Sequence, residues 1–309
     1  MAKEKDVVVN PVLTEPDWFK KYCGIMSEIN RQLETGEMTL DHLDTNNEHK
    51  NPWGIPDWLR ERVNRERTIL QAFFGQEFDL IRFVEDVHRY GRKRLSKALK
   101  FGWEPHFFPE ILMSADATYP GWKIKPEKWF FQASDQGKLL LLQPDGSLVV
   151  SNPAYKLGGV TVLIDTRLKP AYNDGQQMYT KDNLLGPIIE DLRKQQKIQD
   201  YSPRNSRFHT SGNECEVIKP ILAAKLGLKP EQVRLETEIE ANVIPQLYTD
   251  MPRQNDGDTN TSEWREEFFA SRDYRLRGGR SGNGGLAHVY CIDAVRRWSD
   301  QGCRFLAVL

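Results

Sequence analysis

The spacing of apolar residues changes near residue 102, and this change constrains the fold more than any other feature of the chain. Between residues 15 and 102, apolar side chains recur every three or four positions, as in helices that bury one face. Beyond residue 102, short runs rich in Leu, Val and Ile alternate with Gly, Pro, Asp and Asn, which is typical of strands and turns. A helical segment followed by mixed short elements predicts the α+β class.

The helical part is predicted to contain two blocks separated by a polar loop. The first block ends at Gly36, because glycine commonly follows the last turn of a helix. The second covers 60–74 and 78–101, where an apolar stripe recurs at helical spacing. Its basic run RKRLSKALK, at 92–100, is expected to be a solvated helix face rather than a phosphate-binding surface.

Local signals place several elements beyond the helical part. Residues 138–150 contain two apolar runs around Pro-Asp-Gly and predict a hairpin. Residues 158–168 predict a strand, and residues 182–196 predict a short helix. The segments 101–110 and 116–132 are dense in proline and aromatic residues, so they are predicted to be irregular, well-packed loops.

Charge and hydropathy exclude several classes of partner. The chain has 43 basic and 44 acidic residues and a formal net charge of −1, whereas nucleic acids and anionic membranes attract a strongly basic surface. No apolar run approaches the roughly 20 residues of a membrane-spanning helix, and the N-terminus lacks the apolar stretch of a signal peptide. We therefore expect a protein made in the cytoplasm, with no nucleic-acid partner and no membrane insertion.

The residues that usually mark catalysis or metal binding are scattered. Cys23, Cys215, Cys291 and Cys303 lie far apart, so neither a disulfide framework nor a structural zinc site is expected. The sequence contains no nucleophile elbow, phosphate-binding loop, H-E-x-x-H or dinucleotide fingerprint. Its six histidines show no metal-ligand spacing. We predict no cofactor.

One acidic loop is a candidate calcium site. Asp256, Asp258 and Asn260 alternate along the chain, and Glu267 follows Asp256 by eleven residues, as in a calcium-binding loop. However, Thr261 occupies the sixth position, where the sharp turn requires glycine. We expect a solvated acidic loop, with a calcium site of another kind as the alternative.

Short motifs follow one another in the C-terminal third, and each has a structural reason. A helical pattern at 213–228 precedes VRLETEIEAN at 233–242, where early carboxylates complement the exposed N–H groups of a helix. Trp264 supplies a large core side chain, and the pair at 278–279 allows positive φ or close strand approach. Arg304 alternates with apolar residues in a terminal strand.

The order of these motifs resembles the formylglycine-generating-enzyme-like branch of the C-type lectin fold. That branch has R-L-x-T-E-x-E after a helix, then E-W, an R-G-G-S-W-like strand and a terminal G-F-R strand. The resemblance implies a C-type lectin fold for residues 136–309, preceded by a mainly helical region, residues 1–135, of unknown role. The scaffold positions of the match are Arg234, Glu238, Trp264, Gly278, Gly279, Gly302 and Arg304.

Residues 278–309 also resemble the variable region of diversity-generating retroelement target proteins, which use the same branch of this fold. The frame GG…NGG-x-A-x-V…GFR is present, with Cys303 where the family has Phe. In that family the positions between the frame residues vary in chemistry while the scaffold stays fixed. The resemblance implies that nine such positions contact a ligand: His288, Tyr290, Ile292, Asp293, Val295, Arg296, Trp298, Asp300 and Gln301.

The composition of this segment is typical of an interaction surface. Tyr290, Trp298 and Arg296 belong to residue types that are enriched at binding hot spots. After Lys229 the chain has ten Arg and no Lys, and arginine loses less entropy per hydrogen bond than lysine. We expect the nine positions to cluster on one solvent-exposed face. The alternative is a simple core strand with an irregular hairpin.

The resemblance predicts a non-catalytic protein that binds a protein or cell-surface ligand through a diversified C-terminal surface. Such a protein could be a viral or phage receptor binder or a displayed host protein, attached to a larger assembly through its N-terminal region. The alternative is a metal-dependent oxidase of the formylglycine-generating type. The resemblance to that family implies a site in which two nearby cysteines coordinate copper. Here Cys291 and Cys303 are twelve residues apart. An iron enzyme of the same fold would need a histidine-rich ligand set, which the sequence does not show.

Overall fold

The computed structural model describes residues 27–36, 55–172, 178–179 and 181–309. The chain divides into two compact units, Met1–Arg60 and Glu61–Leu309. In the first unit the described residues include a helix at 27–34 and the start of α3 (Asp57–Phe74). The rest of the first predicted helical block, most of the polar loop and Cys23 lie outside the described residues.

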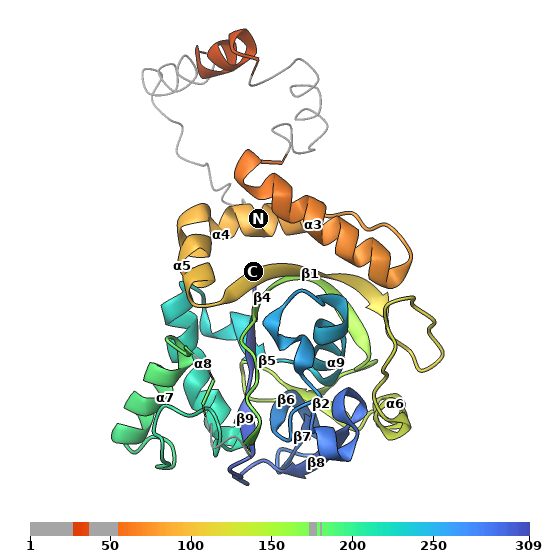
Figure 1. Ribbon diagram of the computed structural model, residues 1–309, viewed down its shortest axis with the longest axis vertical. Helices are drawn as coiled ribbons and strands as arrows, with labels where there is room; N and C mark the ends of the chain where they lie inside the picture. Colours follow the sequence, from red (N-terminus) through yellow and green to blue (C-terminus); the bar gives the residue numbers. More distant parts are fainter. Residues whose placement is uncertain (1–26, 37–54, 173–177, 180) are drawn as a thin grey trace, which may run out of the picture. The chain divides into compact units, whose positions relative to one another are not determined.

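The first sheet of the second unit has four antiparallel strands (Figure 1). In spatial order they are β1 (Trp103–Leu112), β4 (Lys156–Asp165), β10 (Phe305–Val308) and β5 (Val233–Leu235). β1 and β4 pair along their whole length, from Trp103 opposite Asp165 to Leu112 opposite Lys156. β4 contains most of the segment that was predicted to be a strand.

Strand β1 corrects the prediction of irregular loops. Residues 101–110 were expected to be irregular because of their prolines, yet most of them lie in this strand. Proline cannot donate a ladder hydrogen bond and is tolerated at the edge of a sheet, and β1 is an edge strand, paired only with β4. Pro105 and Pro109 therefore fit the strand. The second segment predicted to be irregular also ends in regular structure, the helix α6 (Lys128–Asp135).

The second sheet contains the remaining strands. They are β2 (Leu139–Leu142), β3 (Leu148–Val150), β6 (Ser262–Phe269), β7 (Tyr274–Gly278), β8 (Val289–Asp293) and β9 (Gln301–Cys303). The order is β3-β2-β6-β7-β8, and β9 pairs in parallel with the start of β6. β2 and β3 form the predicted hairpin. Only Arg304 separates β9 from β10, so the chain passes from the second sheet to the first at this residue.

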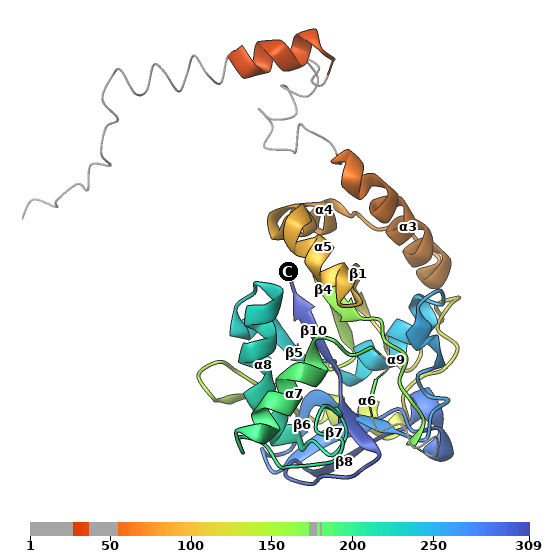
Figure 2. The same cartoon turned by 60° about the vertical axis from the view of Figure 1, so that its left-hand side comes forward.

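Five further helices belong to the second unit, and the mixture of helices and strands confirms the α+β class. They are α4 (Ile81–Tyr90), α5 (Arg92–Lys100), α7 (Leu185–Lys194), α8 (Gly212–Leu226) and α9 (Glu238–Leu247). α4 and α5 lie along the sheet that contains β1, and α7 lies beside α8 (Figures 1 and 2). α4 buries the predicted apolar stripe, and the basic side chains of α5 are exposed, as expected.

The helical segment of the second unit is packed on the sheet, although the sequence predicts a boundary between residues 135 and 136. Residues 61–309 form one unit, so this predicted boundary falls inside it. β1 lies before the boundary but pairs with β4, which lies after it. Glu66 of α3 also connects the two sides of the predicted boundary. Its buried carboxylate accepts hydrogen bonds from the backbone N–H of Phe107 (2.8 Å), before the boundary, and from the hydroxyl of Tyr248 (2.7 Å), after it.

Helices α8 and α9 both begin with a capping box, in which a hydroxyl and a carboxylate satisfy the first backbone N–H groups. In α9 the Thr237 hydroxyl accepts from the backbone N–H of Glu240 (3.4 Å), and the Glu240 carboxylate accepts from the backbone N–H of Thr237 (2.9 Å). This part of the R-L-E-T-E-I-E motif therefore starts a helix.

Replacing Thr237 with alanine tests this cap. We expect Thr237→Ala to lower the free energy of unfolding by about 1 kcal/mol, the usual effect of losing an N-cap acceptor. Thr118→Ala, at an exposed position outside the helices, is the matched control and should change it by less than about 0.5 kcal/mol. Urea denaturation measures both variants. Equal effects would show that the cap does not stabilise α9.

Candidate ligand-binding surface

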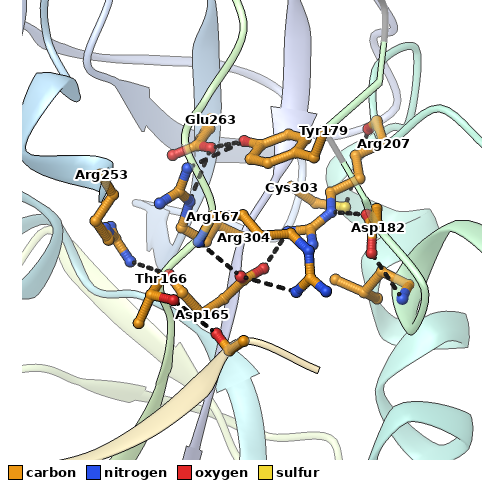
Figure 3. A network of polar contacts seen from close by, with 12 residues as sticks. Asp165, Thr166, Arg167, Tyr179, Asp182, Arg207, Arg253, Glu263, Cys303 and Arg304 are labelled. Carbon is orange, nitrogen blue, oxygen red and sulfur yellow. Dashed lines mark hydrogen bonds and ion pairs between the residues drawn. The ribbon is translucent and has the colours of Figure 1, made fainter. Parts of the chain in front are cut away.

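A set of buried charged side chains lies where β4, β6 and the β9–β10 junction meet (Figure 3). Arg304 is fully buried and forms ion pairs with Glu263 (3.2 Å) and Asp256 (3.3 Å). The Tyr179 hydroxyl donates to the same Glu263 carboxylate, and its ring lies against the guanidinium groups of Arg304 and Arg207. Burial of these charges is tolerated because each has an opposite charge beside it.

Asp165, at the end of β4, is a second centre of this network. Its carboxylate forms ion pairs with Arg207 (2.5 Å) and Arg167 (3.4 Å) and accepts a hydrogen bond from the backbone N–H of Arg167 (3.1 Å). Burial alone would raise the pKa of Asp165, but the guanidinium groups of Arg207, Arg304 and Arg167 lower it below its usual value. Arg207 also pairs with Asp182, so both of its carboxylate partners are charged.

The three carboxylates of the R-L-E-T-E-I-E motif each pair with a different arginine, two of them bidentately. The pairs are Glu240 with Arg234 (2.6 and 2.7 Å), Glu236 with Arg253 (2.6 and 2.8 Å) and Glu238 with Arg265 (2.9 Å). All three glutamates are buried, and Arg253 and Arg265 are buried with them. The motif therefore builds the interior of the molecule.

Two buried glutamates lie beside one another with a shortage of positive charge. Both carboxylate oxygens of Glu267 lie 3.1 Å from the backbone nitrogen of Glu238. Burial, together with the nearby Glu238 and Glu240, raises the pKa of Glu267 to about 8. Burial also raises the pKa of Glu238 to about 7, despite its ion pair with Arg265.

The remaining scaffold positions are constrained by packing. Trp264 is fully buried, and its indole N–H donates to the carbonyl of Thr210 (2.7 Å). A Cβ on Gly278 would lie 2.4 Å from the carbonyl oxygen of His288, so this position requires glycine. Gly279 has a φ of +85°, a conformation that side chains disfavour. Gly302 packs against an aromatic ring, which a Cβ there would approach to 3.3 Å.

The acidic loop at 256–260 does not gather its side chains around a cation. Asp256 pairs with Arg253 and Arg304, and the side-chain oxygen of Asn260 accepts a hydrogen bond from the backbone of Tyr172 (2.6 Å). Asp258 is exposed. Among the residues that the structure describes, no group of three or more His, Cys, Asp or Glu side chains could hold a metal ion.

The nine predicted ligand contacts differ in exposure, so they meet the expectation of one exposed face only in part. His288 and Gln301 are buried, whereas Val295 and Arg296 are exposed. The other five are half-buried: Tyr290, Ile292, Asp293, Trp298 and Asp300. Seven of the nine therefore reach the surface.

Several of these positions surround Arg277 of β7, which the sequence analysis did not single out as a contact. The guanidinium carbon lies 4.3 Å from the ring centre of Tyr290 and 4.1 Å from that of Trp298. Its Nη1 donates to the side-chain oxygen of Gln301 (2.7 Å). The ring of His288 lies 4.8 Å from the ring of Tyr290. We call these five residues the Arg277 cluster.

Strand register explains how the Arg277 cluster forms. Arg277 lies opposite Tyr290 across the β7–β8 pair, and Arg275 lies opposite Ile292; opposite side chains share one face of a sheet. Arg275 is covered by α8, where it donates to the carbonyl of Gly212 (2.8 Å). The alternation of R-L-R at 275–277 could have suggested from the sequence that both arginines lie on one face of a strand. The residues that each arginine contacts could not be predicted, because they lie far away in the sequence.

The cysteines do not form the pair that the oxidase alternative requires. Cys291 is half-buried on β8, and Cys303 is buried on β9. β7 and β6 lie between them, a separation of three strand spacings, or roughly 14 Å. Cys303 lies instead beside Cys215 of α8; burial and this neighbouring thiol raise the pKa of Cys215 well above its usual value.

Half of the arginines after Lys229 lie in the interior of the protein. Five of the ten arginines in this stretch are buried: Arg253, Arg265, Arg275, Arg277 and Arg304. Four of these five pair with buried or half-buried carboxylates. The planar guanidinium suits such multidentate contacts better than an ammonium group.

No family model, no curated protein and no solved structure matches this chain. Within the described part of the chain, none of the helices has the length and apolar character needed to cross a membrane. The function must therefore be inferred from the geometry of the chain's own side chains.

The raised pKa of Glu267 predicts a pH-dependent stability. The folded state holds this proton up to about pH 8, whereas an ordinary glutamate releases it near pH 4.5. Stability should therefore fall as pH rises through this window. Glu267→Gln stays neutral at every pH, so we expect the wild type to lose about 4 kcal/mol relative to this variant between pH 5 and pH 8.5.

Urea denaturation at a series of pH values measures this difference. Glu77→Gln, which removes an exposed carboxylate, is the control and should leave the pH profile of the wild type unchanged. A constant difference in stability between Glu267→Gln and the wild type would contradict the raised pKa.

Proposed function

We propose that this chain is a non-catalytic ligand-binding protein with a C-type lectin fold of the formylglycine-generating-enzyme-like branch. Its ligand surface is the segment around the Arg277 cluster, within a variable region of residues 278–309 that a retroelement diversifies. The ligand is a protein or a cell-surface molecule. Attachment of the protein to a larger assembly, such as a virion, through residues 1–135 is part of the same proposal.

The observation that carries this proposal is the difference between two sets of positions in one segment. The frame residues Gly278, Gly279, Gly302 and Arg304 are constrained, respectively, by close backbone approach, by positive φ, by packing against an aromatic ring and by buried ion pairs. Seven of the nine positions between them reach the surface. A surface that changes while its scaffold persists needs this separation, because substitutions at exposed positions seldom alter stability by more than about 0.5 kcal/mol.

The chemistry of the exposed positions also favours binding. Tyr290 and Trp298 are half-buried and held against Arg277, and stiff, pre-positioned aromatic side chains lose little entropy when they contact a ligand. Val295, an apolar side chain, is 60% exposed beside them in sequence. Such side chains are typical of contact surfaces.

The cysteine positions support binding over the oxidase alternative. A pair of thiols that binds copper must meet and must be able to ionise, since the thiolate is the metal ligand. Cys291 and Cys303 lie on strands separated by two others. Cys303 and Cys215 do lie together, but both are fully buried.

Peptides selected from a display library on the wild-type protein test the proposed surface. We expect Tyr290→Ala to weaken the selected peptides by about tenfold or more, as for a binding hot spot. Tyr274→Ala removes another exposed tyrosine, which is 46% exposed on β7, and should have little effect. Peptides that lose equal affinity on both variants, or on neither, would place the binding surface elsewhere.

The gene neighbourhood tests diversification. We expect a reverse-transcriptase gene and a near-identical template copy of residues 278–309 that differs only at adenines. Sequencing the locus in related isolates is the measurement, with residues 233–264 as the control segment that should not vary. Variation spread evenly over both segments would contradict the proposal.

A further inference from the structure

The buried arginines of the second unit share one property that Arg277 lacks. Five of them form ion pairs with aspartate or glutamate: Arg207, Arg253, Arg265, Arg275 and Arg304. Arg193 has no carboxylate partner among the residues that the structure describes, but it donates to the backbone carbonyls of several residues between 199 and 208. Each of these six guanidinium groups therefore has a carboxylate or several carbonyls beside it, although Nη atoms of Arg207, Arg265 and Arg304 are buried without a hydrogen bond.

Arg277 is 3% exposed, and its side chain makes one hydrogen bond within the described residues, from Nη1 to the side-chain oxygen of Gln301. No carboxylate of those residues lies within ion-pair distance, and its Nε is buried without a partner. Asp300, the acidic group nearby, pairs with Arg280 (2.9 Å). Within the described part of the chain, Arg277 is therefore a buried positive charge without a counter-charge.

Gln301 contributes a second unpaired donor. A guanidinium group has no acceptor, so the amide atom that faces Arg277 must be the oxygen. The amide nitrogen therefore points elsewhere, and it is buried without a partner. An unpaired buried donor costs about 1–3 kcal/mol, which makes two such donors on touching side chains costly unless an acceptor joins them.

We propose that the Arg277 cluster binds its ligand through a carboxylate group, which accepts hydrogen bonds from Arg277 and Gln301. This inference rests on the proposed function and names the chemical class of the ligand. The rings of Tyr290 and Trp298 flank the guanidinium and contact the apolar part of the ligand that carries the carboxylate. One negative charge matches the single buried positive charge, whereas a dianionic phosphate would leave a charge uncompensated.

The electrostatics of the site agree with this geometry. Burial lowers the pKa of Arg277 to about 10, because the charged form lacks a close counter-charge; Asp300, which lies nearby but beyond ion-pair distance, opposes the shift and Arg280 adds to it. The other buried arginine on the same strand, Arg275, has its pKa raised despite burial, because Glu266 and Glu216 lie beside it. A bound carboxylate would supply for Arg277 what these glutamates supply for Arg275.

Titration of the full-length protein with benzoate tests the carboxylate directly. The readouts are the NMR signals of the Arg277 Nε–H and the Trp298 indole N–H. Benzamide is the neutral analogue of the same shape, and phenylphosphonate represents a phosphate-type ligand. We expect saturable shifts with benzoate, with affinity about tenfold or more above that for either analogue, as for a charge-assisted pair.

Two variants distinguish a direct contact between Arg277 and the benzoate carboxylate from a general electrostatic attraction of benzoate to the protein. Arg277→Gln and Arg272→Gln each remove one positive charge, and Arg272 is an exposed residue between β6 and β7, outside the proposed ligand contacts. We expect Arg277→Gln to weaken benzoate by about tenfold or more and Arg272→Gln by less than about twofold. Equal losses would overturn the inference. If Arg277→Gln fails to fold, the benzoate–benzamide comparison on the wild type decides alone.

The outcomes also separate this inference from the proposed function. Equal affinity for benzoate and benzamide would overturn the carboxylate assignment while leaving a ligand-binding surface. Tighter binding of phenylphosphonate, or no saturable shift with any probe, would overturn it as well. In those cases the selected peptides and the Tyr290→Ala variant still test the proposed function independently.

Discussion

The buried ion pairs of Arg304 fix the point at which the chain passes from the second sheet of the second unit to the first. The residue lies between β9, which pairs with β6, and β10, which pairs with β4 and β5. Its guanidinium reaches Glu263 of β6 and Asp256. Removing one partner of such a pair typically costs about 3–5 kcal/mol, because the other charge stays buried. The C-terminal strands therefore depend on this contact.

The same constraint extends through the interior. Each buried arginine needs carboxylates or carbonyls around it, and these come from β4, from the start of α9 and from β6. The balance is incomplete at Glu238 and Glu267, whose pKa values burial raises. Such a network is sensitive to the position of each charge, and it leaves the framework around residues 278–309 little freedom to vary.

The proposed ligand surface would benefit from that rigidity. β8 is the edge strand of the second sheet, and β7 presents Arg277 to the aromatic rings of Tyr290 and Trp298. Among the described residues, Arg277 differs from the other buried arginines of the second unit because it has neither a carboxylate nor a set of backbone carbonyls beside its guanidinium group. The framework would therefore hold the proposed site in place, and our proposal is that a ligand carboxylate supplies the counter-charge that the described residues do not. Strand β7 contains both Arg275, which forms buried ion pairs, and Arg277, which is the centre of the proposed ligand site.

The sequence by itself determined the elements whose signal is local. The apolar period predicted α4, the Pro-Asp-Gly turn predicted the β2–β3 hairpin, and both follow from the geometry of neighbouring residues. Only the tertiary structure decided that the proline-rich β1 is a strand, because its place at a sheet edge depends on distant β4. It also decided which arginines are buried and that, among the described residues, Arg277 has no acidic partner, since the partners of a charge lie far from it in the chain.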